Sequence, residues 1–290
     1  MNILLIMQVT HLEEFGFLAI RGKDAVSFLQ GYTTCDLNNL SPEHSLIGAI
    51  CNLQGRMVSS FRITSLTDGV LLRLDKGLID HTTKFLAKYI VFSKAELSDM
   101  SESYVCYGAI GEIPSTPPAT VGDSTLNSGI VTIKVSEKGP RYEIWSQEAV
   151  TGDDIQGNAW RQAEIEDGYA WVNAQTTEEF IPQMFNYHNI GGIDFEKGCY
   201  LGQEIIARLE YRGKLKRKLH RGLSNNPASP GDAILNQQGK EIGLVASVAE
   251  DGDAYTLLAV LQNEDDSDIE ARVYEGDLFS FSPIQVEIDQ

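Results

Sequence analysis

Residues 197–204, Lys-Gly-Cys-Tyr-Leu-Gly-Gln-Glu, hold the densest group of chemically active side chains in the sequence. A thiol, a cation, an aromatic ring and an acid fall within this short stretch. A cysteine acts as a nucleophile or metal ligand only as the thiolate, and Lys197 together with a helix starting near Gln203 would stabilise that form of Cys199. Cys199 and Lys197 are therefore the candidate catalytic residues.

Two glycines flank this thiol, at positions 198 and 202. Glycine at Gly198 and Gly202 would let the backbone turn tightly around Cys199 or approach a neighbour closely. The residues after Gly202 are good helix formers, so the pattern favours a loop followed by a helix. The alternative is a structural cysteine buried in a turn, because free cysteine is among the most buried residue types.

A longer pattern surrounds the stretch, since it follows Phe180-Ile181-Pro182-Gln183, Asn186 and Gly191-Gly192-Ile193. In this order the residues resemble the signature of the YgfZ-type folate-binding proteins, which are relatives of the glycine-cleavage T protein, an aminomethyltransferase. The start of the chain is also similar, with the family's pattern falling on Gly22, Asp24, Gln30 and Gly31.

The resemblance implies an α+β fold of the T-protein type, with three domains around a central channel. The expected parts are a discontinuous folate-binding core over 1–215, a ferredoxin-like insert over 45–145 and a C-terminal antiparallel β-barrel over 216–290. Tetrahydrofolate or a derivative is the implied cofactor.

The elements that must position these residues follow from hydrophobic patterning. Apolar runs bounded by turn residues predict strands at 15–20, 47–53, 57–63, 69–74 and 142–145. Apolar residues at helical spacing predict helices at 25–30, 78–89 and 159–166, the first with Asp24 as its N-cap. Strands followed by a helix and more strands are typical of an α+β sandwich.

Two further segments have a distinct composition. Residues 111–129 are rich in Pro, Ser, Thr and Gly, which predicts a surface loop between strands. Beyond Leu219, short apolar runs at 233–235, 241–248 and 255–261 are broken by Gly, Asn and Asp turns. That spacing predicts a small antiparallel barrel.

The composition excludes several classes of function. The 290-residue chain carries a formal net charge of −18, which disfavours adhesion to nucleic acid or anionic membrane as a property of the whole surface. Its four cysteines lack CxxC or Cys/His spacing, so neither a zinc site nor a complete iron–sulfur ligand set is encoded. Scattered thiols predict a cytoplasmic protein, and the apolar residues 2–7 are too short to span a bilayer and lack a basic leader.

The resemblance also implies where a folate would bind. A pterin needs a flat platform and a carboxylate that accepts paired N–H contacts. The family's carboxylate falls on Glu166, and its two aromatic positions fall on Phe15 and Trp160. Tyr200 and Gln203 complete the expected folate contacts. The alternative for Phe15 and Trp160 is that they are ordinary core residues.

The sequence departs from the T proteins where aminomethyl transfer needs charge. Counting from Gln54-Gly55, the T proteins' acidic pair falls on Ser59 and Ser60. A neutral hydroxyl cannot replace a carboxylate that steadies a developing cation. An aminomethyltransferase is therefore disfavoured, and whether the chain is an enzyme at all stays open.

A basic run covers residues 208–221, within an otherwise acidic chain. Concentrated cations indicate contact with phosphates, with the polyglutamate tail of a folate or with a tRNA backbone. No RNA-binding motif accompanies the run, so a tRNA contact is expected to be weak and salt-sensitive. The alternative is a charged strand or hairpin edge that resists aggregation.

Three functions follow from these patterns. The first, implied by the resemblance, is a folate-binding accessory protein that supports iron–sulfur enzymes, including those that thiolate tRNA. The second is a folate-dependent aminomethyltransferase or methyltransferase of the T-protein class. The third is an RNA-binding or scaffold module, which the acidic balance disfavours.

Overall fold

The computed structural model describes residues 7–113, 117–155, 158–263, 267–274 and 276–284. The chain forms two compact units. The first consists of Met1–Gly48 and Ser60–Gln156, and the second of Ala49–Ser59 and Gly157–Gln290. Short helices combine with two open sheets and one closed barrel, which confirms the predicted α+β class. The boundaries predicted for the three domains stay a prediction.

One open sheet has five strands in the order β3-β4-β5-β2-β6. They are β2 (Phe15–Arg21), β3 (Leu46–Cys51), β4 (Met57–Leu66), β5 (Gly69–Asp75) and β6 (Glu96–Asp99). β2 and β5 are continuous apolar runs, and nearly all their residues are buried, as expected for strands covered on both faces. The four strands predicted between residues 15 and 74 are thereby confirmed.

Short helices accompany this sheet. They are α1 (Ala25–Gln30), α2 (Ile79–Ala87), η1 (Leu37–Asn39), η2 (Lys76–Leu78) and η3 (Ile90–Phe92). Asp24 occupies the N-cap position of α1, as predicted, but its side chain does not cap the helix. The carboxylate instead accepts a hydrogen bond at 2.8 Å from the backbone N–H of Lys94, in the segment before β6.

A second sheet in the first unit has the order β11-β1-β7-β10-β9-β8. Its strands are β1 (Gln8–His11), β7 (Val105–Ile110), β8 (Ser124–Asn127), β9 (Ile130–Lys134), β10 (Arg141–Ser146) and β11 (Asp153–Asp154). β8 lies within the predicted loop 111–129, so that prediction was wrong in part. Ser128 and Gly129, with φ of 52° and 82°, form a two-residue hairpin turn between β8 and β9.

The second unit contains a closed barrel with the order β12-β15-β14-β13-β16-β17, which confirms the predicted antiparallel barrel. Its strands are β12 (Arg217–Ser224), β13 (Ala233–Asn236), β14 (Glu241–Asp251), β15 (Ala254–Gln262), β16 (Ile269–Val273) and β17 (Phe279–Pro283). Alternate residues such as Val245, Leu257 and Phe281 fill its interior.

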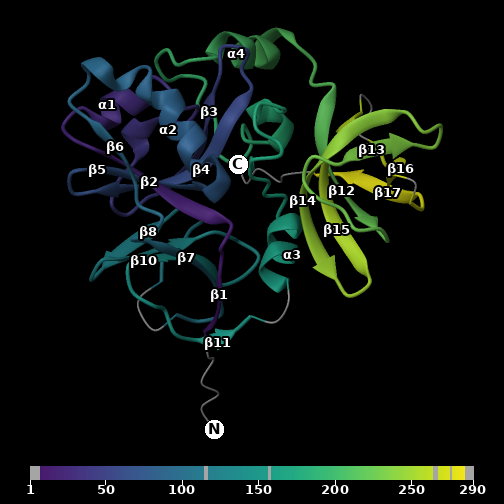
Figure 1. Ribbon diagram of the computed structural model, residues 1–290, viewed down its shortest axis with the longest axis horizontal. Coiled ribbons are helices and arrows are strands. Elements are labelled where there is room, and N and C mark those ends of the chain that lie inside the picture. Colours follow the sequence, from purple (N-terminus) through teal and green to yellow (C-terminus); the bar gives the residue numbers. More distant parts are fainter. Residues whose placement is uncertain (1–6, 114–116, 156–157, 264–266, 275, 285–290) are drawn as a thin grey trace. The chain divides into compact units, whose positions relative to one another are not determined.

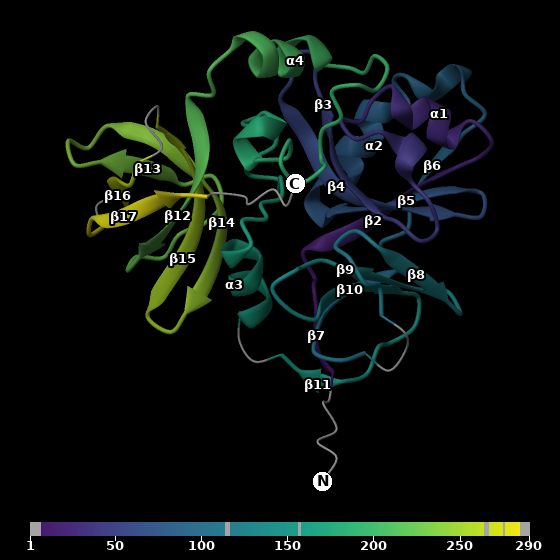
Figure 2. The same cartoon turned by 180° about the vertical axis from the view of Figure 1, so that it is seen from behind.

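The same unit holds α3 (Ala159–Glu166), η4 (Pro182–Phe185) and α4 (Gln203–Arg212). The bounds of α3 are those predicted. α3 packs against β14 of the barrel, and the two elements lie side by side in both views (Figure 1 and Figure 2). No described helix is long and apolar enough to cross a membrane.

A buried ion cluster lies in the first unit. Glu143 accepts two hydrogen bonds from Arg73, at 2.6 and 3.2 Å, and its carboxylate lies 3.4 Å from Arg62. The indole N–H of Trp145 donates to the same carboxylate at 3.0 Å. The Arg73 guanidinium also covers the ring of Phe15 at 4.0 Å from its centroid. Ion pairs therefore join β4 and β5 of one sheet to β10 of the other, and those between Arg73 and Glu143 are charge-assisted hydrogen bonds.

Removing the charge of Glu143 should destabilise the first unit. Burial alone would raise the pKa of Glu143, but Arg73 and Arg62 outweigh it and hold the pKa below its ordinary value of 4.5. Glu143→Gln leaves two buried guanidinium groups around a neutral amide, which should cost about 3 kcal/mol of unfolding free energy near neutral pH.

The depressed pKa also fixes the direction of the pH effect. The contribution of Glu143 to the unfolding free energy is complete at pH values above the pKa that this carboxyl has in the unfolded chain. It is lost as the pH falls through the lower pKa that the carboxyl has in the folded protein. Urea denaturation between about pH 3 and pH 8 measures this dependence. As the pH is lowered, the unfolding free energy of Glu143→Gln should fall less steeply than that of the unaltered chain, giving a shallower acid limb. Glu148→Gln, at an exposed position, is the control. Equal acid limbs for the three chains would contradict this role.

Candidate functional site

The candidate loop begins at Asp194 and ends at α4. The carboxylate of Asp194 accepts hydrogen bonds from the backbone N–H groups of Glu196 and Lys197, at 2.8 and 2.9 Å. This Asx-type turn redirects the chain just before Cys199. The Cys199 side chain is exposed, so the structural alternative of a buried cysteine is wrong.

Tyr200 anchors the loop one residue after the thiol. Its side chain is buried, and the Lys197 ammonium lies 5.1 Å from its ring centroid in a cation–π contact. The Gln203 side-chain oxygen accepts from the Tyr200 backbone N–H at 2.9 Å, and the Gln203 N–H donates back to the Tyr200 carbonyl at 3.2 Å. The loop thus braces itself through Lys197, Tyr200 and Gln203 while Cys199 faces outward.

The helix after the loop starts at Gln203, as predicted. Gly202 precedes it in the left-handed conformation, with φ of 84°. A Cβ at Gly202 would lie 2.4 Å from the Asn52 carbonyl oxygen and 3.2 Å from the Gly55 Cα. Gly198 differs, because a Cβ there would meet no atom within 4 Å. Only Gly202 is required by conformation and by close approach.

The partner in this close approach is the tip of the β3–β4 hairpin, residues 51–56. Arg56 ties the tip to another segment of the same second unit by donating to the carbonyl oxygens of Glu178 and Glu179, at 3.1 and 2.7 Å. From the other side, the Gln183 side chain of η4 donates to the Ile206 carbonyl of α4 at 2.7 Å. Chain segments far apart in sequence therefore hold the start of α4.

The chain's other three cysteines are buried, and none of them forms a disulfide. Cys51 lies beneath the loop, with its Cβ 3.3 Å from the Cβ position at Gly202, and burial raises the pKa of its thiol. Cys51 thus stays protonated while Cys199 meets solvent. Within the described ranges, no group of three or more His, Cys, Asp or Glu side chains could hold a metal ion.

The residues predicted to contact folate lie on β2, on α3, on α4 and in the loop before α4. Tyr200 and Gln203 belong to the loop and α4, whereas Trp160 and Glu166 lie on α3 of the same unit. Phe15 lies on β2 of the first unit, buried under Arg73.

The carboxylates of α3 differ in their surroundings. Glu166 is exposed at the C-terminal end of the helix, whereas Trp160 and Glu164 are buried on its inner face. Glu164 accepts hydrogen bonds from the Trp171 indole at 3.2 Å and from Arg161 at 2.9 Å. Sequence reasoning overlooked Glu164, although its i, i+4 spacing from Trp160 places both on one face of α3.

Ser59 and Ser60 are buried in β4. The Ser59 hydroxyl makes no hydrogen bond to any described residue. A buried hydroxyl without a hydrogen bond lowers the free energy of unfolding. The position of Ser59 is therefore set by its place in the strand and not by a hydrogen-bond partner. Neither serine carries the charge that the T proteins have at this point.

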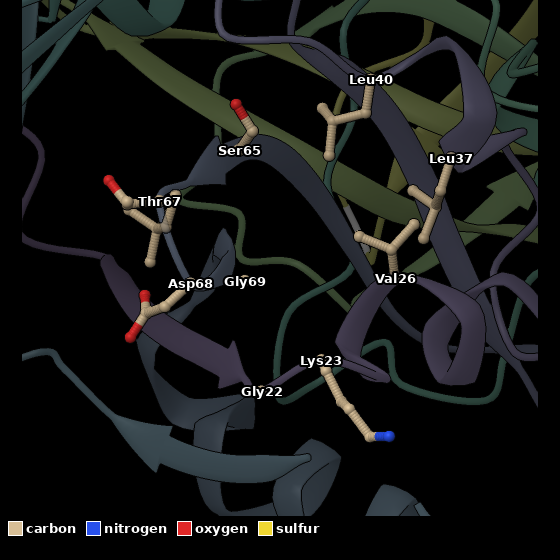
Figure 3. Close-up of a pocket in the computed structure, with 10 residues that line it drawn as sticks. Gly22, Lys23, Val26, Leu37, Leu40, Ser65, Thr67, Asp68 and Gly69 are labelled. Atoms are coloured by element: carbon tan, nitrogen blue, oxygen red, sulfur yellow. The ribbon is translucent and has the colours of Figure 1, made fainter. Parts of the chain in front are cut away.

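A separate cavity of about 430 Å³ lies in the first unit, between the β4–β5 turn and α1 (Figure 3). Val26, Leu37 and Leu40 form its apolar side, and Thr67 and Asp68 lie across from them. None of the predicted site residues lines this cavity.

Comparison with known proteins identifies the family. No protein-family model matches the chain. The tRNA-modifying protein YgfZ of Colwellia psychrerythraea is 31% identical, over 88% of this chain and 85% of its own length. The chain belongs to the YgfZ family. The YgfZ protein of Vibrio atlanticus is 29% identical over 98% of this chain and 94% of its own length.

The fold of this YgfZ-family chain is also that of the T proteins. The crystal structure of the glycine cleavage system aminomethyltransferase T from Bartonella henselae superposes with a TM-score of 0.71. The match covers 97% of this chain and 86% of that protein, at 13% sequence identity. The resemblance inferred from residues 180–204 is thereby confirmed for both family and fold.

The two glycines of the YgfZ-type loop provide a matched test of its geometry. Gly202→Ala forces a Cβ against a backbone carbonyl in a left-handed conformation, which should lower the unfolding free energy by about 2 kcal/mol or more. Gly198→Ala should change it by less than about 0.5 kcal/mol. Urea denaturation, with the alkylation rate of Cys199 as a local probe, measures both. Equal effects of the two substitutions would show that the Asn52 contact does not hold the loop.

Proposed function

We propose that this YgfZ-family chain is a folate-binding accessory protein that supports the assembly or maintenance of iron–sulfur proteins and tRNA modification. The observation that carries the proposal is the exposed Cys199 thiol on a loop braced by Asp194, Tyr200 and Gln203. A thiol kept only for packing would be buried, as Cys35, Cys51 and Cys106 are. The printed names of the relatives support the link to tRNA modification.

We propose that α3 contributes to the folate site. The exposed carboxylate of Glu166, at the end of α3, has the chemistry to accept paired N–H contacts from a pterin edge. Phe15, Trp160, Tyr200 and Gln203 are proposed as the remaining contacts. Tetrahydrofolate, when bound, supplies a carrier for one-carbon units.

The reactive group that the chain itself would supply is the sulfur atom of Cys199. As a thiolate, Cys199 is a soft ligand that can hold iron transiently, or a nucleophile that can open a disulfide. The Lys197 ammonium is held over the ring of Tyr200, three residues further along the chain, which keeps a cation on the same loop as the thiol. Iron–sulfur enzymes, including tRNA-thiolating ones, are the proposed partners, in the cytoplasm.

The second candidate is a folate-dependent aminomethyltransferase or methyltransferase, which the T-protein fold favours. Ser59 and Ser60 argue against it, because both are neutral and buried where the T proteins have acids. Release of an aminomethyl group to tetrahydrofolate by the purified chain would establish this candidate instead.

Folate binding is tested by calorimetric titration with tetrahydrofolate and with its formyl derivative. Glu166→Gln removes the charge from the proposed hydrogen bonds, so the dissociation constant should rise about tenfold or more. Glu241→Gln, an exposed acid on β14 of the same unit, is the control. No heat of binding with either folate would refute the cofactor assignment.

The thiol is tested in cells that lack the endogenous protein. Cys199→Ala should abolish support of iron–sulfur enzyme activity while leaving the unfolding free energy and folate affinity unchanged, because the exposed side chain contributes little packing. Gly198→Ala, the adjacent and sterically open position, is the control and should complement fully. Full complementation by Cys199→Ala would refute the role of the thiol.

A further inference from the structure

The basic arm, defined as residues 208–221, concentrates positive charge in an acidic chain. It carries seven lysines and arginines against one acid, Glu210, whereas the chain as a whole has a net charge of −18. The cations are Arg208, Arg212, Lys214, Lys216, Arg217, Lys218 and Arg221. The arm extends from α4 through a linker into β12 (Figure 1).

The first cations of the arm are not compensated. Arg208, Arg212 and Lys214 are exposed and form no ion pair with any other described residue. A cluster of unpaired cations attracts a polyanion strongly, because little competing charge must be displaced.

Protection of a strand edge does not explain these charges. β12 is paired with β15 on one side and with β17 on the other, within the closed barrel, so it is not an open edge. Arg208, Arg212 and Lys214 lie on α4 and the linker, outside any strand. The expectation of a charged hairpin edge is therefore wrong for these three residues.

An exposed aromatic ring accompanies the cations. Tyr211 is 68% exposed, and Arg208, three residues before it and four before Arg212, is the neighbour of both side chains on the α4 surface. Its ring meets Phe195 edge to face, with centroids 6.1 Å apart and planes at 68°. The Tyr211 ring is thus supported by a neighbouring ring while most of its surface stays open to solvent, as in a platform for stacking a base.

We propose that the basic arm is a docking surface for RNA, whose phosphates contact Arg208, Arg212 and Lys214 and one of whose bases stacks on Tyr211. This inference rests on the proposed function for its purpose and names the partner of that site. Cations interleaved with an exposed ring favour RNA over an acidic peptide, which has no flat base to stack.

Docking on the arm would place RNA beside the Cys199 loop. Arg208 lies five residues after Gln203, the first residue of α4, which is roughly 8 Å of helical rise. Phe195, the ring that supports Tyr211, belongs to the loop between Asp194 and Tyr200. Bound RNA should therefore shield Cys199 from a bulky alkylating reagent.

The test is fluorescence anisotropy with an unmodified tRNA transcript over a series of salt concentrations. The triple variant Arg208→Gln/Arg212→Gln/Lys214→Gln should weaken binding and reduce the salt slope by about 2 to 3, since each lost phosphate contact removes about 0.7 to 0.9. Lys84→Gln/Lys88→Gln/Lys94→Gln changes the net charge equally at exposed positions in the first unit. Equal losses from the two triple variants would overturn the proposal.

Stacking is tested separately from charge. Tyr211→Ala should weaken tRNA binding about tenfold with little change in the salt slope, and Tyr211→Phe should retain the affinity. Thermal denaturation of each variant confirms folding. Failure of Tyr211→Ala to weaken binding would overturn the stacking contact.

Two further readouts separate this inference from its alternatives. Bound tRNA should slow alkylation of Cys199 by a maleimide-linked polymer, whereas unchanged alkylation would place the RNA elsewhere. Polyglutamate that competes as well as tRNA, with the same dependence on Tyr211, would identify an acidic-peptide site and overturn the proposal. Tetrahydrofolate titration of the arm variant should be unchanged, so loss of RNA binding and loss of folate binding are distinguishable.

Discussion

The candidate site depends on one close contact, between Gly202 at the start of α4 and the Asn52 carbonyl at the tip of the β3–β4 hairpin. Only a residue without a side chain can occupy this point in the left-handed conformation. The contact fixes where α4 begins, and thereby where the preceding loop must end. Tyr200 then packs inward and Cys199 remains in solvent. The exposure of the thiol is thus a consequence of backbone packing and not of the local sequence alone.

Positive charge serves opposite physical purposes in the two units. Arg62 and Arg73 are buried, where two guanidinium groups are balanced by Glu143 and help to hold β4, β5 and β10 together. Such a cluster costs desolvation and is stable only while its hydrogen bonds are complete. Arg208, Arg212 and Lys214 of the basic arm are instead exposed to water, where an external polyanion could reach them. The same residue types therefore stabilise the fold in one place and carry the proposed interface in another.

The sequence predicts those features that depend on local pattern. The barrel, α3 and the start of α4 follow from periodicity and from Gly202, and the pattern over residues 180–204 indicated the family. β8 was missed because Pro, Ser and Thr around it obscured a four-residue strand. The contact between Gly202 and Asn52 joins residues about 150 positions apart, and no local pattern encodes such a pairing. For the same reason Glu143 could not be recognised as the partner of Arg73.

The acidity of the rest of the chain strengthens the case for one docking orientation. With a net charge of −18, most of the surface repels a polyanion over the Debye length of about 8 Å at physiological salt. In the proposed docking, RNA would be attracted to the concentrated cations of the basic arm, which follows the Cys199 loop directly in the chain. Repulsion elsewhere would limit non-productive encounters as effectively as attraction promotes the productive one. The proposed arrangement would thus select one orientation without needing high affinity, which is a physical reason for concentrating cations just after the exposed thiol in the chain.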